Sequence, residues 1–419
     1  MTYSLFGKKF TAHSGISQLM DDMNDGLRSP DAIMLGGGNP AAIPAMDRYF
    51  QALCQSMLDD GSLCEALCNY DGPQGKNALL NALAGLLSQE LGWPITAKNI
   101  ALTNGSQSAF FYLFNLFAGR SGNGALKRVL FPLAPEYLGY ADAGLEDDMF
   151  VSAKPTIAHL PDGQFKYHVD FDRLNVSDDI GLICVSRPTN PTGNVITDLE
   201  LKRLDDLARQ HRVPLLIDNA YGLPFPGIIF CPATPLWNPN IILCMSLSKL
   251  GLPGARCGIV IASEATIAAV GNMNGIISLA PGGIGPALAA EMIGRGDLMR
   301  LSNTVIRPFY QQRVEQTIAT LRRYLSPERC LIHKPEGAIF LWLWFQNLPI
   351  TTEALYQRLK QRGVLMVPGH YFFPGLEGDW PHTQQCMRMN YVPDADKIER
   401  GIAILAEEVE RAHRETVRG

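Results

Sequence analysis

A glycine-rich stretch, residues 246–256 (SLSKLGLPGAR), brings together several side chains that could do chemistry. Lys249 offers an amine that could be used covalently. Ser246 and Ser248 add hydroxyls, and Arg256 adds a guanidinium seven residues after the lysine, so the stretch could bind a phosphate group. A lysine at the end of an apolar strand is costly to bury unless it is paired or used covalently. A lysine that simply reaches solvent is the alternative, and this stretch alone leaves both open.

A predicted helix start supplies a second group of donors. A short strand ends at Thr103, and a helix begins near Gly105 with Ser106 and Gln107 in its first turn. Free backbone N–H groups and the helix dipole favour an anion at such a position. An ordinary helix cap would use the same residues, so the helix start alone does not decide.

Four more side chains follow other predicted strands. They are an aromatic ring, an amide, a carboxylate and a phenol: Tyr137, Asn190, Asp218 and Tyr221. The strands that precede them are predicted over residues 128–131, 180–186 and 213–217. In a parallel sheet flanked by helices, ligands bind beyond the carboxyl ends of the strands. We therefore expect these side chains to meet the lysine stretch at one edge of a sheet.

Strands alternate with helices over most of the chain, which predicts a largely parallel sheet between helices. The remaining strands of this sheet are predicted at 100–103, 241–246 and 258–262, and its helices at 45–67, 77–91, from 105 onward, and 197–212. A long amphipathic helix from 298 to 325 then leads to a second domain. That domain is predicted to contain strands at 338–344, 364–369 and 386–391, a helix at 352–362 and a terminal helix.

Two further features lie outside the predicted sheet. Arg388 stands in an apolar strand-like segment, where a guanidinium requires a carboxylate partner; a structural salt bridge would also satisfy it. The run Gly36 to Gly38 lets the backbone approach another group closely, or forms a flexible turn.

The composition excludes several classes of protein. With 419 residues, 47% hydrophobic and 18% charged, the chain is typical of a soluble globular protein. A net charge of −5 gives no sign of a nucleic-acid surface. Nine cysteines without CxxC pairs favour reduced thiols and a cytoplasmic location, and Cys64 and Cys68 favour core packing over a metal site because no histidine is near. No signal peptide or membrane span is predicted, since the long uncharged runs contain Pro and Gly.

Taken together, the side chains suit a phosphorylated heteroaromatic aldehyde. A lysine would form a Schiff base with it, and an acid would pair with its ring nitrogen. The lysine stretch, residues 190–193 (NPTG) and residues 218–221 (DNAY) resemble the class I/II, fold-type I pyridoxal-phosphate aminotransferases. The resemblance runs from Gly36 to Tyr391. Many members place the arginine eight residues after the lysine, whereas here the spacing is seven.

The resemblance implies roles for these residues. Lys249 would bind the cofactor and move a proton, and Asp218 would pair with the ring nitrogen. Asn190 and Tyr221 would bind the ring hydroxyl oxygen, and Tyr137 would stack on the ring. The phosphate would be bound by Ser106, Gln107, Ser246, Ser248, Arg256 and, from the neighbouring subunit, Tyr70. The substrate would be bound by Arg388, Asn190 and Gly38.

The resemblance also implies the architecture. We expect an α/β fold with an N-terminal arm (1–45), a large cofactor-binding domain (46–300) and a small α+β domain (301–419). The large domain would hold a mostly parallel, seven-stranded sheet. We expect a homodimer with shared active sites, pyridoxal 5′-phosphate as cofactor, and no metal.

For activity, the resemblance implies amino transfer between valine or a similar small aliphatic amino acid and pyruvate, giving alanine and 3-methyl-2-oxobutanoate. An apolar set supports a monocarboxylate substrate: Phe6, Ile16, Tyr371 and Phe372. A lyase, a decarboxylase or an aminotransferase with another substrate is the alternative on the same fold. A regulator with an aminotransferase-like domain is a further alternative, although the 35 residues before the glycine run are too few for a winged helix.

Overall fold

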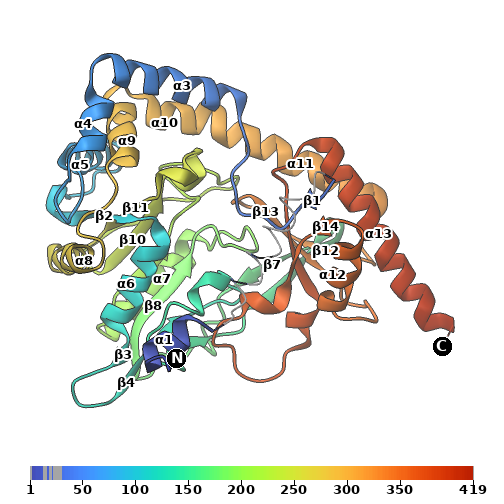
Figure 1. Cartoon of the computed structure of the whole chain (residues 1–419). Helices are drawn as coiled ribbons and strands as arrows, with labels where there is room; N and C mark the ends of the chain where they lie inside the picture. The colour runs from blue at the N-terminus through green and yellow to red at the C-terminus, as the bar shows by residue number, and fades with distance from the viewer. Residues whose placement is uncertain (1, 13–16, 18–20, 22–30, 419) are drawn as a thin grey trace.

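The structure is a computed structural model that describes residues 2–12, 17, 21 and 31–418. Its two main sheets lie side by side, and the helices α10 (Asp297–Leu301) and α11 (Arg307–Tyr324) run along one edge from the first sheet to the second (Figure 1). No helix in the described part of the chain combines the length and the apolar character needed to cross a membrane.

The first sheet has eight strands in the order β2-β11-β10-β9-β8-β4-β3, with β5 on β4. Their bounds are β2 (Ile100–Asn104), β3 (Gly119–Arg120), β4 (Leu126–Phe131), β5 (Phe150–Ser152), β8 (Ile180–Ser186), β9 (Leu215–Asp218), β10 (Ile241–Ser246) and β11 (Cys257–Ile261). Neighbours from β5 to β10 pair in parallel, which confirms the mostly parallel sheet. The predicted number of seven strands was one too few, because the two-residue β3 pairs back onto β4.

The central strands are apolar on both faces because helices cover both faces. On one side, α6 (Ser106–Phe117) and α8 (Glu264–Ile277) pack against alternate strand residues such as Leu216 and Ile242. On the other side, α5 (Asn77–Leu91) and α7 (Asp198–Gln210) pack against their neighbours, such as Ile217 and Leu243. Because helices cover both faces, the ends of the strands are the part of this sheet that a ligand can reach.

Helix ends follow local sequence signals. Thr197 and Glu200 form the capping box that starts α7, within the helix predicted at 197–212. The helix predicted at 45–67 is instead two helices, α3 (Pro44–Asp59) and α4 (Ser62–Cys68), because Gly61 between them has a positive φ of 82°. The helix predicted at 298–325 likewise contains a π-helical turn at Ser302–Ile306 between α10 and α11.

The second sheet has six strands in the order β15-β16-β13-β12-β7-β6. They are β6 (Thr156–Leu160), β7 (Gln164–His168), β12 (Leu331–His333), β13 (Phe340–Trp344), β15 (Val367–Pro368) and β16 (Cys386–Asn390). The hairpin β6–β7 comes from the middle of the chain and joins this sheet by parallel pairing with β12. The division at residues 1–45, 46–300 and 301–419 stays a prediction.

The remaining elements complete the two halves. The helices are α1 (Leu5–Phe10), α9 (Ile284–Gly294), α12 (Thr352–Gln361) and α13 (Ala395–Arg418). The short strands β1 (Ile33–Met34) and β14 (Val364–Leu365) pair in parallel. The pairing fixes the start of the glycine run beside the second sheet, where the main-chain N–H of Asn390 donates to the carbonyl of Leu35.

Candidate active site

A cavity of about 360 Å³ lies at the carboxyl ends of β8, β9 and β10. Twelve of the thirteen residues predicted for the site line it: Gly38, Ser106, Gln107, Tyr137, Asn190, Asp218, Tyr221, Ser246, Ser248, Lys249, Arg256 and Arg388. The thirteenth, Tyr70, lies outside the cavity and is 86% exposed. The cavity thus brings together residues that are far apart in the chain, from Gly38 to Arg388.

Lys249 lies in a short helical turn, Ser248–Leu250, directly after β10. Its Nζ donates a 2.6 Å hydrogen bond to the carbonyl oxygen of Gly38, and it lies 5.3 Å from the centre of the Tyr221 ring. Burial, together with the positive charge of Arg388, lowers the pKa of this amine to about 8. The amine is therefore available as a nucleophile or base near neutral pH.

The serines and Arg256 gather where β10 ends and α6 begins. The main-chain N–H of Ser248 donates to Ser246 Oγ across 3.0 Å, and the two hydroxyls are also 3.0 Å apart. Arg256 packs so closely on Gly105 that a Cβ atom there would lie 2.1 Å from its guanidinium. The side chain of Gln107 donates to the carbonyl of Gly139 at 3.0 Å, so this side chain is already engaged.

Asp218 ends β9 and lines the same cavity as Lys249. Its Oδ2 accepts a 2.6 Å hydrogen bond from the Tyr140 hydroxyl, and its Oδ1 accepts from the main-chain N–H of Ala220 at 3.0 Å. Burial raises the pKa of Asp218, although both hydrogen bonds and the charge of Lys249 oppose the rise. A carboxylate held this way is suited to pair with a cation in the cavity.

Arg388 comes from β16 of the second sheet and is 2% exposed. Its Nη1 donates to Asn190 Oδ1 and its Nη2 to the carbonyl of Gly36, at 2.8 and 2.6 Å. Its Nε is buried without a partner, and in the described part of the chain no carboxylate forms an ion pair with it. Burial lowers its pKa to about 10, so the group remains charged. A buried guanidinium with this arrangement is suited to a bound carboxylate rather than to an internal salt bridge.

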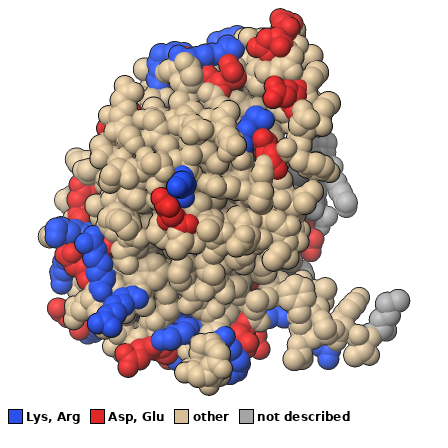
Figure 2. Space-filling model, turned by 90° about the vertical axis from the view of Figure 1, so that its left-hand side faces the viewer, with Lys and Arg blue, Asp and Glu red and all other residues tan. Residues whose placement is uncertain are grey.

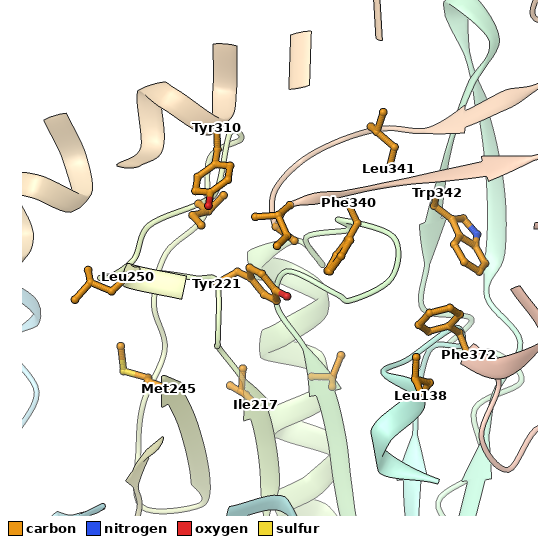
Figure 3. Packing of buried hydrophobic residues seen from close by; sticks show 14 of the residues in the cluster. Leu138, Ile217, Tyr221, Met245, Leu250, Tyr310, Phe340, Leu341, Trp342 and Phe372 are labelled. Carbon is orange, nitrogen blue, oxygen red and sulfur yellow. The ribbon is translucent and has the colours of Figure 1, made fainter. Parts of the chain in front are cut away.

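Aromatic rings shape the cavity around these charges. Tyr221 packs edge-on against Phe340 with their centres 6.1 Å apart, and Figure 3 shows it between the strands of the first sheet and β13. Arg388 lies over the rings of Phe340 and Phe372, 4.2 and 5.0 Å from their centres. The ring of Tyr137 fits only because residue 139 is glycine, since a Cβ there would lie 2.4 Å from it.

The apolar set expected for the substrate is not brought together at the cavity. Phe372 is fully buried behind Arg388, and Phe6 is 60% exposed and packs on Phe10 of the same helix. Tyr371 packs against His370, and Ile16 lies outside the described residues. None of Phe6, Tyr371 and Phe372 lines the cavity, and their part in a preference for a monocarboxylate stays a prediction.

Other residues at the cavity were not foreseen from the sequence. Asn39, Phe110, Leu138, Ala220 and Pro253 also line it. Tyr140, which binds Asp218, lies three residues after Tyr137 in the short helical turn Leu138–Tyr140. The sequence does show two tyrosines three residues apart, which could have drawn attention to Tyr140. The apolar residues around them, however, do not indicate that Tyr140 binds Asp218.

Comparison with known proteins gives the family. The sequence model for "Aminotransferase class I and II" matches residues 45–405. The chain is 72% identical over 416 residues to the valine–pyruvate aminotransferase of Escherichia coli strain K12, covering 99% of this chain and 100% of that protein.

Solved structures agree with this result. The crystal structure of valine–pyruvate aminotransferase from Salmonella typhimurium LT2 is 73% identical with a TM-score of 0.90, covering 96% of this chain and 100% of that one. A putative amino-acid aminotransferase from Psychrobacter arcticum 273-4 is 45% identical with a TM-score of 0.96, covering 99% of both chains. This chain belongs to the class I and II aminotransferases.

Proposed function

We propose that this enzyme transfers an amino group between valine and pyruvate, forming 3-methyl-2-oxobutanoate and alanine. The single observation that carries the proposal is the buried guanidinium of Arg388, which no carboxylate among the described residues pairs with and which faces the same cavity as the amine of Lys249. A carboxylate-binding group beside an amine of lowered pKa is what a site for 2-amino and 2-oxo acids requires. The identity of the substrates is supported by the 72% identity to the Escherichia coli valine–pyruvate aminotransferase.

The residues at the cavity fit pyridoxal 5′-phosphate, the cofactor of this family. Arg256 packs against Gly105, just before the N-terminus of α6. One end of the cavity therefore offers serine hydroxyls, a guanidinium and a helix N-terminus, which together suit a phosphate. Asp218 would pair with the ring nitrogen, Tyr137 would stack on the ring, and Lys249 would bind the cofactor covalently. When bound, the cofactor supplies an electron-withdrawing ring that stabilises negative charge on the substrate Cα.

The phosphate set consists of Ser106, Gln107, Ser246, Ser248 and Arg256. The side chain of Gln107 already donates to Gly139, so we expect its main-chain N–H to be the donor. Asn190 and Tyr221 would bind the ring hydroxyl oxygen. Asn190 would thereby connect the cofactor to Arg388, to which its amide oxygen is hydrogen-bonded.

During the reaction, two side chains act on the substrate. Arg388 would bind the α-carboxylate in bidentate fashion and so orient the Cα–H bond. Lys249 Nζ would take the proton from Cα, which its lowered pKa permits near neutral pH. The carbonyl of Gly38, which accepts a hydrogen bond from Nζ in this structure, would help to orient the amine.

We also propose a homodimer with shared active sites. Exposed apolar side chains gather around the ends of α4, α8 and α9, close to Tyr70: Leu67, Ile276, Ile277, Leu279 and Ile284. Figure 2 shows a broad face whose charged side chains lie mainly at its rim. An apolar patch of this kind marks an interaction surface, and a second copy of the chain would cover it. Tyr70 would then reach the partner's phosphate site.

A cytoplasmic location is proposed as well. All nine cysteines are free thiols, and two of them, Cys64 and Cys68, are exposed. Exposed free thiols suit a reducing compartment.

The test is product analysis with purified, cofactor-loaded protein. Valine and pyruvate should yield alanine and 3-methyl-2-oxobutanoate in equal amounts, and aspartate should be a poor amino donor. A screen of amino donors and oxo-acid acceptors in the same assay would separate this activity from a lyase or decarboxylase, which would release a product without forming alanine. Absence of both products from valine and pyruvate would exclude the proposed reaction.

A further inference from the structure

A chain of four side chains leads from Asp218 at the cavity to three buried residues, Tyr140, Ser186 and Glu136. Tyr140 donates to Asp218 Oδ2 at 2.6 Å, and its hydroxyl oxygen lies 3.2 Å from Ser186 Oγ. The Ser186 hydroxyl bonds in turn to Glu136 Oε2, and the main-chain N–H of Ser186 donates to Glu136 Oε1 at 2.9 Å. Glu136 and Tyr140 are fully buried and Ser186 is 1% exposed, so water does not replace any of these contacts.

The number of protons available to these hydrogen-bonded side chains determines their total charge. Three contacts join Glu136 to Asp218, and each contact needs one proton to be a hydrogen bond. The hydroxyls of Ser186 and Tyr140 supply two protons. The third must come from one of the two carboxyl groups, so the complete chain carries one carboxyl proton and one negative charge.

The surroundings place that proton on Glu136. Asp218 lines the cavity, accepts a second hydrogen bond from Ala220, and is stabilised as an anion by Lys249. Glu136 faces titratable groups that are neutral or negative: Asp218 from β9, Tyr140 and Tyr137 from its own loop, and Cys184 from β8. Burial and the charge of Asp218 raise the pKa of Glu136 to about 8, although its hydrogen bonds with Ser186 oppose the rise.

We propose that Glu136 is a protonated positioning residue that, through Ser186 and Tyr140, keeps Asp218 as the single anion of this chain. Each group then donates a hydrogen bond to the next: Glu136 to Ser186, Ser186 to Tyr140, and Tyr140 to Asp218. Asp218 is thereby oriented and held ionised to receive a cationic ring nitrogen. The link to the ring rests on the proposed function, whereas the protonation of Glu136 does not.

The backbone of Glu136 fixes one end of this chain. Its main-chain N–H donates to the carbonyl of Phe372 at 2.8 Å, which ties the loop that carries Tyr137 to the segment after β15. The carboxyl group binds the end of β8. Glu136 therefore joins three separate segments, and a charged group there would have no cation to compensate it in the described surroundings.

The test uses the protein freed of cofactor, wild type against Glu136→Gln. Glutamine mimics the neutral acid, because its oxygen can accept from the Ser186 N–H and its N–H can donate to Ser186 Oγ. The infrared difference spectrum at pH 6 should show the carbonyl stretch of a protonated carboxyl, which should disappear as the pH rises through about 8. A carboxylate band at pH 6 instead would overturn the proposal.

Glu200→Gln is the matched control. Glu200 is also buried and accepts hydrogen bonds, from Thr197 and Val169, but the hydrogen bonds lower its pKa although burial opposes them. Its difference spectrum at pH 6 should show a carboxylate. The same protonated band in this control would contradict the assignment to Glu136.

Denaturant unfolding gives a second readout. Unfolded glutamate ionises near its ordinary pKa of 4.5, whereas native Glu136 keeps its proton to about 8. Between these values, the unfolding constant of wild type relative to Glu136→Gln should rise about tenfold per pH unit, and then level off. A ratio that stays constant would overturn the proposal. If Glu136→Gln does not fold, the wild-type spectrum at pH 6 minus that at pH 9 should still contain the protonated band, and its absence would overturn the proposal.

The outcomes separate this inference from the proposed function. A carboxylate at residue 136 in a protein that converts valine and pyruvate would refute the inference alone. A protonated Glu136 in a protein without that activity would refute the proposed reaction alone.

Discussion

The guanidinium of Arg388 donates a 2.8 Å hydrogen bond to the amide oxygen of Asn190, 198 positions earlier in the chain. Arg388 belongs to the second sheet, whereas Asn190 follows β8 of the first. This contact joins the two halves at the cavity. It also places the group proposed to bind substrate directly beside a group proposed to bind cofactor.

Replacing Arg388 by lysine should weaken amino-acid recognition. Lysine keeps the charge but loses the planar pair of donors, so the transition state should lose about 2–3 kcal/mol of stabilisation. The kcat/KM for valine should then fall roughly 30- to 150-fold. Steady-state kinetics measure this change. Arg322→Lys is the control, because Arg322 also donates to main-chain carbonyls but lies away from the cavity. Unchanged kinetics for Arg388→Lys, or an equal loss in the control, would count against the assignment.

The pH dependence of cofactor loading should report on Lys249. Only the neutral amine can attack the aldehyde, and burial lowers the pKa of this amine from 10.5 to about 8. Below that pKa the neutral fraction falls tenfold per pH unit; at pH 7 it is roughly 300 times that of an ordinary lysine. The rate at which cofactor-free protein binds pyridoxal phosphate should thus rise with pH and level off above about 8. A rate still rising steeply beyond pH 9 would contradict this environment.

Gly105→Ala should weaken cofactor binding. A methyl group at this position would overlap the Arg256 guanidinium and displace it from the proposed phosphate site. We expect the Kd for pyridoxal phosphate to rise at least tenfold, or about 1.4 kcal/mol. Gly124→Ala controls for backbone strain, since Gly124 has a similar φ of 81° and no atom within 4 Å of the added carbon. Titration of both cofactor-free variants decides the matter; equal affinities would disprove the role of Gly105.

Ile276→Asp should separate the proposed dimer. Ile276 is 85% exposed on α8, and burying an unpaired carboxylate at an apolar interface is costly. Sedimentation should show a dimer for wild type and a shift towards monomer for this variant. Leu199→Asp is the control on α7, where Leu199 is 68% exposed, and it should remain dimeric. A monomeric wild type with full activity would refute shared active sites.

The strand pattern was sufficient to predict part of the cavity lining. Asn190, Asp218 and Lys249 each follow an apolar strand, and the carboxyl ends of parallel strands share one edge. The reversed direction of β11 and the joining of β6–β7 to the second sheet depend on pairings between distant segments, which local periodicity does not encode.

The contacts behind the cavity were likewise beyond sequence reasoning. Tyr140 and Ser186 reach each other only because β8, β9 and the loop after β4 converge, and neither residue carries a motif that names its partner. The break at Gly61 was missed because a glycine within a helical pattern is often tolerated. In contrast, α5 and β10 were predicted with the bounds they have, since turn-forming residues precede α5 and an apolar run defines β10.

The central claim is that Lys249 is the residue to which the cofactor is bound. Borohydride reduction of cofactor-loaded protein, followed by digestion and mass spectrometry, tests it directly by fixing the cofactor to its amine. We predict that the pyridoxyl group is found on the peptide containing Lys249 and that Lys249→Ala carries none. Attachment to another lysine, or a fully active protein without any modified peptide, would contradict the account.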